Sequence, residues 1–328
     1  MPTPAKRLIA ATATVAAVGL PLAACGGDGE GDLETAATRA APPAASFPTP
    51  EDDSLDALLE RVPATDLVVL PAGQVFVPGR NRFGFIVSSV AGEEVADAEV
   101  ALYAARGGDG PARGPYPARI ESLETDPAFT AKTTADDPDS AKVLYASEVR
   151  FDRAGEWRLA AVVRDSEGYA TTRLPSVEVN RNDRVPGPGD PAPRVHTPTV
   201  ADAGSVAEID TRVPHSTLHG DDLAEVLGSE PVALLFATPA LCQSRVCGPV
   251  VDVAEQVKRD HDDEAAFIYS EIYEGNDPAE GLREPVRAFN LPTEPWLFVI
   301  DRRGRIDTRI EGAFSVAELE DAVERVVD

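Results

Sequence analysis

The chain contains three cysteines, Cys25, Cys242 and Cys247, and the last two lie close together. They stand between a solid apolar run at 232–236 and a segment, 250–257, whose apolar residues fall on one helical face. A cysteine between a buried strand and the next helix lies near unsatisfied N–H groups and the partial positive charge of the helix N-terminus. Both favour a thiolate over a thiol, and Arg245 adds a nearby cation. The pattern therefore predicts nucleophilic or redox sulfur chemistry.

Cys25 follows a segment that is typical of exported proteins. Lys6 and Arg7 form a short basic region, and the apolar run from 8 to 22 is too short for a comfortable membrane span. The run closes on Leu-Ala-Ala-Cys at 22–25, which resembles the lipobox of bacterial lipoproteins. This resemblance implies a signal peptide at 1–24, and membrane lipid as the partner bound through the Cys25 thiol. The protein would then lie on the extracytoplasmic face of the cell membrane, in an oxidising space. The alternative is an ordinary signal peptide with a stray cysteine.

With Cys25 assigned to lipid, Cys242 and Cys247 are the only possible disulfide pair. A structural disulfide that pins a helix start is the alternative to a redox-active one. The loop that such a bond closes is short, so the stabilisation gained from the unfolded chain is small, which favours redox use.

The spacing of the two cysteines also limits where a helix can begin. Five residues of regular helix separate Cα atoms by about 7.5 Å along the axis, which exceeds the span of a disulfide. The helix should therefore begin after Cys242, with Cys247 in its first turn or two. Ser244 is the preferred cap by residue type, and Gln243 is the other candidate.

The last part of the chain alternates strand and helix. Strands are expected at 232–236, 265–272, 296–300 and 306–310, and helices at 250–257, 282–289 and 315–326. The order is β-α-β-α-β-β-α, with a right-handed parallel first crossover. Ser315 and Glu318 form a capping box at the start of the last helix.

Together with the segment EPWLFVIDRRGRI at 294–306, these elements resemble the thioredoxin superfamily, notably its TlpA-like and peroxiredoxin branches. In the disulfide-exchange branch a cis-proline lies against the cysteines, six residues before an aspartate, and Pro295 and Asp301 hold those places. The resemblance implies that Cys242 is the attacking thiolate, Cys247 the resolving one, and that Pro295 shapes the substrate groove. It implies no cofactor.

The sequence departs from this family at the site. Four residues separate the cysteines where members usually have two, Leu241 stands where tryptophan is usual, and Leu235 replaces the buried acid. These departures speak against an efficient general reductase. One peroxiredoxin branch does have four-residue spacing. Peroxiredoxins, however, carry an arginine where Pro295 stands, so peroxidase chemistry is less favoured than thiol–disulfide exchange.

Copper delivery, as in the SCO-type family, is a further alternative and would need a histidine beside the thiolates. His215 and His219 have i, i+4 spacing, but Pro214 and Gly220 favour a loop, so surface histidines are the expectation. No metal site is predicted.

The length of 328 residues predicts two folded regions with tails. Residues 25–60 are rich in Gly, Pro and acids and predict a flexible tether. Residues 61–182 contain many short runs of period two and favour an all-β immunoglobulin-like sandwich. Within them the segment FDRAGEWRLAAVVRD resembles a strand of bacterial Ig-like modules, with Trp157 in the core. A Pro-rich linker at 183–198 then leads to an α/β thioredoxin-like domain at 199–328.

The formal net charge of -26 excludes nucleic acid as a partner. The sequence favours a membrane-anchored thiol–disulfide oxidoreductase whose partners are the thiols and disulfides of exported proteins. The alternative is a non-catalytic scaffold lipoprotein in which the disulfide is structural and the β-sandwich docks a partner.

Overall fold

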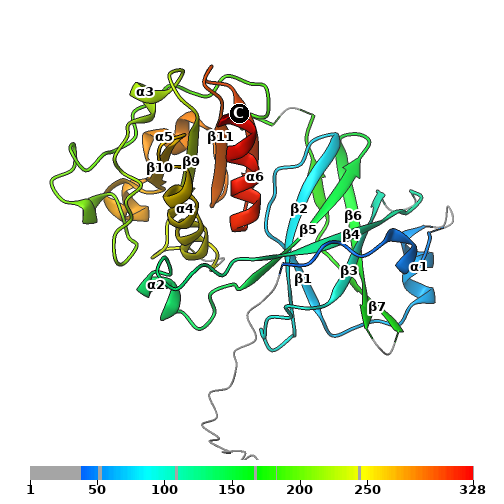
Figure 1. Ribbon diagram of the computed structural model, residues 1–328. Coiled ribbons are helices and arrows are strands. Elements are labelled where there is room, and N and C mark those ends of the chain that lie inside the picture. Colours follow the sequence, from blue (N-terminus) through cyan, green and yellow to red (C-terminus); the bar gives the residue numbers. More distant parts are fainter. Residues whose placement is uncertain are drawn as a thin grey trace, which may run out of the picture. The chain divides into compact units, whose positions relative to one another are not determined.

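The computed structural model describes residues 38–50, 54–107, 110–165, 168–181, 183–242 and 245–327. The signal peptide, Cys25, Gln243 and Ser244 lie outside the described residues. Two β-sheets organise the described chain, one of eight strands and one of four (Figure 1).

The first sheet is antiparallel, in the order β1-β2-β5-β4-β3-β6-β7, with β8 also paired to β6. Its strands are β1 (Val68–Pro71), β2 (Gly79–Ser88), β3 (Glu99–Arg106), β4 (Arg113–Ser122), β5 (Val143–Phe151), β6 (Gly155–Asp165), β7 (Gly168–Arg173) and β8 (Val177–Val179). Strand β4 pairs with β3 up to Pro117 and with β5 from Ala118 onward. Because it changes partner along its length, β4 joins two groups of strands into one sheet.

Alternation along β6 explains how this sheet builds its cores. Trp157 and the residues at every second position after it join a buried cluster with aromatic residues of β2 and β5, such as Phe85 and Tyr145. Ala160 and Val162, which lie between them, belong to a second buried cluster. The period-two pattern of the sequence is therefore a pattern of two buried faces.

The second of these clusters corrects the extent of the predicted tether. Phe47, Leu55 and Leu58 are buried there against β3 and β6. Leu55 and Leu58 belong to helix α1 (Leu55–Arg61), and Phe47 precedes it. The N-cap residue of this helix, Ser54, accepts a hydrogen bond from the Ala57 N–H. Leu55, Leu58 and Leu59 have the spacing of one helical face, and this pattern overrides the polar composition around it. This part of the segment is a packed helix and not a tether.

The second sheet has the order β10-β9-β11-β12. Its strands are β9 (Val232–Ala237), β10 (Ala266–Glu271), β11 (Trp296–Ile300) and β12 (Ile306–Glu311). β9 and β10 are parallel, whereas β11 is antiparallel to both β9 and β12. The α-helices of this region are α3 (Leu223–Val226), α4 (Cys247–His261), α5 (Glu284–Ala288) and α6 (Val316–Val327). The predicted order β-α-β-α-β-β-α is observed from β9 to α6.

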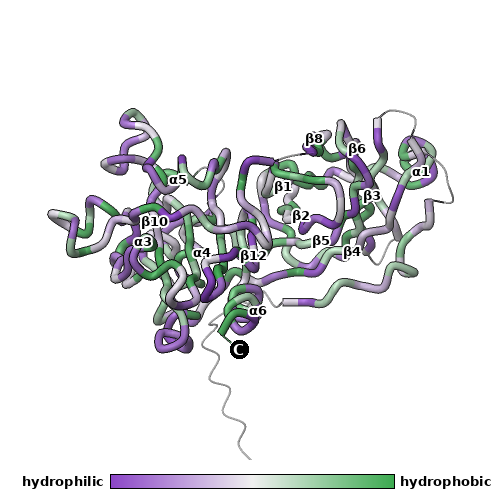
Figure 2. The backbone as a smooth tube through the Cα atoms, turned by 90° about the horizontal axis from the view of Figure 1, so that it is seen from above, coloured by the Kyte–Doolittle hydropathy of each residue, from purple (hydrophilic) through white to green (hydrophobic). Residues whose placement is uncertain are grey.

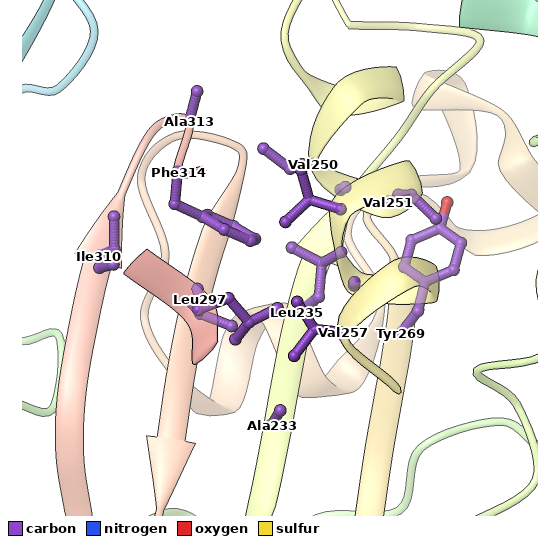
Figure 3. Packing of buried hydrophobic residues seen from close by; sticks show 14 of the residues in the cluster. Ala233, Leu235, Val250, Val251, Val257, Tyr269, Leu297, Ile310, Ala313 and Phe314 are labelled. Carbon is purple, nitrogen blue, oxygen red and sulfur yellow. The ribbon is translucent and has the colours of Figure 1, made fainter. Parts of the chain in front are cut away.

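Both faces of this sheet are covered. Leu235 of β9 and Leu297 of β11 pack with Val250 and Val257 of α4 (Figure 3). Leu319 of α6 belongs to the same cluster. The alternate residues of β9, from Val232 to Phe236, pack on the opposite face with α3 and α5. Coloured by hydropathy, the tube shows green, apolar stretches along α6 (Figure 2). A doubly covered sheet with this order is thioredoxin-like.

The expected capping box at the start of α6 is confirmed. Ser315 Oγ accepts the Glu318 N–H at 3.2 Å, and the Glu318 carboxylate accepts the Ser315 N–H at 3.3 Å. The remaining short helices are α2 (Lys132–Ala135) and the 3-10 turns Ala44–Ser46, Val206–Glu208, Glu274–Asn276 and Pro278–Glu280.

The Pro-rich segment at 183–198 packs on the second sheet. Val185, Ala192 and Val195 are buried with α3 and α5 in the same cluster. The Ile306 N–H donates to the Asp190 carbonyl at 3.0 Å, and other backbone bonds continue the contact. Prolines prevent a regular ladder here, but isolated hydrogen bonds and apolar contacts remain possible. The boundaries at 183 and 198 stay predictions.

Within the described ranges, every helix is too short or too polar to span a bilayer.

Candidate redox site

The two cysteines lie where β9 gives way to α4. Cys242 is in the connecting loop, Cys247 is the first residue of α4, and a disulfide joins them with a Cα–Cα distance of 6.0 Å. The expectation that the helix begins after Cys242 is confirmed. The expected cap is wrong, because Val246 occupies the N-cap position and makes no capping side-chain hydrogen bond.

The two sulfur-bearing residues differ in exposure. Cys247 is fully buried in the cluster between α4 and the sheet, whereas Cys242 is partly exposed and packs at the edge of that cluster. Leu241, beside it, is 36% exposed. An incoming sulfur can therefore approach Cys242 more readily than Cys247.

Pro295 follows a cis peptide bond, as predicted. It immediately precedes β11, whose Trp296 pairs with Phe236 near the end of β9. The register places Pro295 at the end of the sheet from which the cysteine loop leaves. Its role in substrate binding stays a prediction.

A buried polar group behind the loop was not predicted from the sequence. Glu271, the last residue of β10, is 1% exposed and stands beside Ala237 in the ladder. Its Oε1 accepts hydrogen bonds from the Tyr269 hydroxyl at 2.5 Å and the Thr211 hydroxyl at 2.6 Å. Burial, followed by the charge of Glu271, raises the pKa of Tyr269 well above its ordinary value. Thr211 Oγ1 in turn accepts the Ala240 N–H at 3.1 Å, so this network supports the cysteine loop.

The histidines do not converge on the cysteines. The expectation of surface histidines is wrong for His219, which is 2% exposed, whereas His215 is exposed on the same loop. His219 Nε2 lies 3.4 Å from Asp210, and its ring lies against Tyr269. Burial alone would raise the pKa of Asp210, but the neighbouring His219 and hydrogen bonds from two backbone N–H groups lower it overall. No cluster of three or more metal-binding side chains occurs within the described ranges.

A second unpredicted feature is the segment 123–142 between β4 and β5, which we call the strap. It contains α2 and contacts α4 along one helical face. The Ala131 N–H donates to Asp252 Oδ2 at 3.1 Å, and the Asp126 N–H donates to Gln256 Oε1 at 2.8 Å. A Cβ added at Gly248 would lie 2.8 Å from Thr134 Oγ1, so the Thr134 side chain packs closely on the helix at this glycine.

A buried ion pair reinforces the contact between the strap and α4. Arg212 Nε donates to Asp252 Oδ1 at 2.8 Å, and both side chains are almost fully buried. Arg212 also donates to the Phe129 carbonyl of the strap at 2.6 Å. Asp252 thus binds Arg212 through Oδ1 and the backbone of the strap through Oδ2. A single carboxylate of α4 therefore holds both Arg212 and the strap.

The strap also contacts Arg245, which lies between the two cysteines. Asp137 Oδ1 lies 2.5 Å from Arg245 Nη1, and Asp139 Oδ2 lies 3.4 Å from Nη2. The Ala141 N–H donates to the Arg245 carbonyl at 3.2 Å. Arg245 has a φ of 60°, which is uncommon for a residue with a side chain and is fixed here from two sides.

Comparisons with known proteins give neighbours among solved structures only, since no family model and no curated protein matches the chain. One neighbour is a Chlorobium tepidum protein assigned as thiol:disulfide interchange protein DsbE, with 15% identity and a TM-score of 0.32, covering 44% of this chain and 99% of the other. Another is a thiol:disulfide interchange protein of the thioredoxin family from Chlorobium tepidum TLS. It has 21% identity and a TM-score of 0.30, and covers 43% of this chain and 97% of the other.

Proposed function

We propose that the protein is a membrane-anchored, extracytoplasmic thiol–disulfide oxidoreductase that acts on exported proteins. The observation that carries the proposal is the Cys242–Cys247 disulfide between β9 and α4, with one partner partly exposed and the other buried. This is the asymmetry that an attacking and a resolving cysteine require. The cis bond before Pro295, at the same end of the sheet, leaves backbone available for pairing with a substrate chain.

The exchange proceeds in two balanced steps. In the reduced protein the Cys242 thiolate attacks one sulfur of a substrate disulfide, and the other substrate sulfur leaves as a thiolate. The Cys247 thiolate then attacks the Cys242 sulfur, which forms the intramolecular bond and releases the second substrate thiolate. Two electrons pass from the cysteine pair to the substrate, and the protons lost by the two cysteines balance those gained by the substrate. The reverse sequence oxidises a substrate dithiol.

Membrane attachment and the role of the first sheet complete the proposal. Lipid on Cys25 would hold the protein at the extracytoplasmic face, where substrates with disulfides occur. The eight-stranded sheet would serve as an immunoglobulin-like module that also presents the strap to the cysteine loop.

The reduction potential of the cysteine pair tests the proposal. We expect a value above about -300 mV when the protein is equilibrated with thiol–disulfide buffers and its free thiols are trapped and counted. A value well below this range would identify a structural disulfide and support the scaffold alternative. A matched measurement on Cys25→Ser protein should give the same potential, because Cys25 takes no part in the exchange.

A further inference from the structure

The loop between the cysteines carries one cation, and two acids from a distant part of the chain hold it. Arg245 lies within this loop, three residues after Cys242 and two before Cys247. Its guanidinium meets Asp137 and Asp139 of the strap, which are separated from it by more than one hundred residues. The redox loop is therefore not built from the thioredoxin-like region alone.

The charges of Arg245, Asp137 and Asp139 affect the stability of the cysteine thiolates. Arg245 by itself would stabilise thiolates beside it and so favour the reduced state. Two carboxylates against one guanidinium leave a local net charge of about -1. Negative charge beside a thiolate disfavours it, so the oxidised state gains relative to the reduced state. In redox terms the strap should lower the reduction potential of the pair.

Geometry supports an electrostatic role beyond simple packing. The Asp137 side chain is 27% exposed and that of Arg245 is 47% exposed, so the pair is only partly screened by water. The Ala141 N–H fixes the Arg245 carbonyl, and thus the backbone that presents the guanidinium to the strap. The Thr134–Gly248 contact holds the strap against the first turn of α4, next to Cys247.

We propose that Asp137 and Asp139 are positioning residues that act through Arg245 and keep the cysteine pair more reducing than an unpaired Arg245 would leave it. This inference rests on the proposed function. It adds that the strap, which connects two strands of the first sheet, adjusts the reduction potential of the cysteine pair beside the second sheet.

Variants of opposite charge test it in the full chain. Asp137→Asn with Asp139→Asn leaves Arg245 unopposed, and we expect the potential to rise by about 30 mV, which is a tenfold change in the equilibrium constant. Arg245→Gln leaves the two acids unopposed, and we expect the potential to fall. Loss of packing alone would loosen the same loop in both cases and would move both potentials in one direction.

Asp136→Asn is the matched control. Asp136 lies on the same strap beside Asp137, is largely exposed, and pairs with Lys132 at 4.0 Å. In this variant we expect the equilibrium constant between the oxidised and the reduced cysteine pair to change less than twofold. High salt should shrink the opposite shifts of the other two variants, because their charges are partly exposed.

The outcomes separate this inference from the proposed function. Shifts of the same sign in the two variants, or an Asp136→Asn shift as large as that of the double variant, would overturn the role of the strap. The wild-type potential alone decides whether the pair is an exchange site. Stronger dithiol buffers keep the shifts measurable even if that potential is low, and thermal unfolding verifies that each variant is folded.

Discussion

At the scale of residues, the unequal burial of the two cysteines predicts the order in which they would react in the proposed exchange. We expect Cys247→Ser protein to accumulate a mixed disulfide between Cys242 and added glutathione disulfide, because no resolving thiol remains to release it. Cys242→Ser protein should form this adduct far more slowly, since Cys247 is fully buried. Mass spectrometry of unreduced protein measures both rates. Equal rates would contradict the assignment of Cys242 as the attacking residue.

A glycine next to the site makes a second prediction. Gly248→Ala should destabilise the protein by about 1 kcal/mol, because the new Cβ would lie 2.8 Å from Thr134 Oγ1 in a packed contact. In a Thr134→Ala background the nearest strap atom, the Cβ, is 3.7 Å away, and the same substitution should become neutral or stabilising. Urea unfolding of the four proteins gives the comparison. An equal cost in both backgrounds would show that the strap does not press on α4.

Several residues of the site could be predicted from local sequence, and others could not. The two cysteines and the Ser315–Glu318 box are short-range patterns with their own chemistry, whereas the cis bond before Pro295 was implied by the resemblance to the thioredoxin superfamily. Glu271 was missed, although a carboxylate at the end of an apolar strand is a signal that could have drawn attention to it. Asp137 could not be found, because no local pattern shows that a loop between two strands reaches residue 245.

At the scale of elements, α6 is tied to the first sheet by charge. Arg82 donates to both carboxylate oxygens of Glu318 at 2.7 Å, and Arg119 adds a third contact at 2.5 Å. Burial would raise the pKa of Glu318, but the charge and hydrogen bonds of Arg82, followed by Arg119, lower it below its ordinary 4.5. The capping box was predictable within α6, whereas these partners lie about 200 residues or more away.

This ion cluster predicts how stability depends on pH. A carboxylate whose folded pKa is lowered stabilises the fold above its unfolded value, and this contribution is lost as pH falls through the folded value. We therefore expect Glu318→Gln to reduce the free energy of unfolding by about 2 kcal/mol at neutral pH. The difference from wild type should shrink steadily below pH 4.5. Denaturant unfolding across this range provides the measurement, and a pH-independent difference would contradict the assigned role.

Some elements were predictable from the sequence and others were not. The strands and helices from β9 to α6 were predictable because each carries a clear apolar period. The predicted tether at 25–60 and the predicted linker at 183–198 looked like unstructured connections, yet both contribute buried residues to cores. A few apolar residues such as Phe47 or Val185 suffice to pack a segment whose average composition is polar, and composition alone does not reveal it.

At the scale of the whole molecule, the eight-stranded sheet shows why topology was harder to predict than content. Many short strands were expected in this region and are present. Their connection through β4, which pairs with β3 and β5 by different halves, depends on contacts between distant segments. Hydrophobic alternation marks which side of a strand is buried, but it does not identify the strand's neighbour.

The N-terminal segment of the chain predicts attachment to a membrane. The motif that ends at Cys25 implies cleavage before this residue and a diacylglycerol thioether on its sulfur. Two acyl chains give a stable anchor, because each buried methylene contributes about 0.8 kcal/mol. We expect the wild-type protein to sediment with membranes and to be released by detergent but not by salt, since apolar burial is insensitive to charge screening.

Cys25→Ser should either leave the protein unprocessed or release it into the soluble extracytoplasmic fraction. Cys242→Ser is the matched control: it also removes one cysteine, but it should fractionate with membranes like the wild type. Mass spectrometry of the mature N-terminus distinguishes a lipid-modified Cys25 from an unmodified chain. A soluble wild-type protein that retains residues before Cys25 would refute the anchor. The potential of the Cys242–Cys247 pair would still be measurable in it, because the proposed lipid would be attached to Cys25 and not to either cysteine of the disulfide.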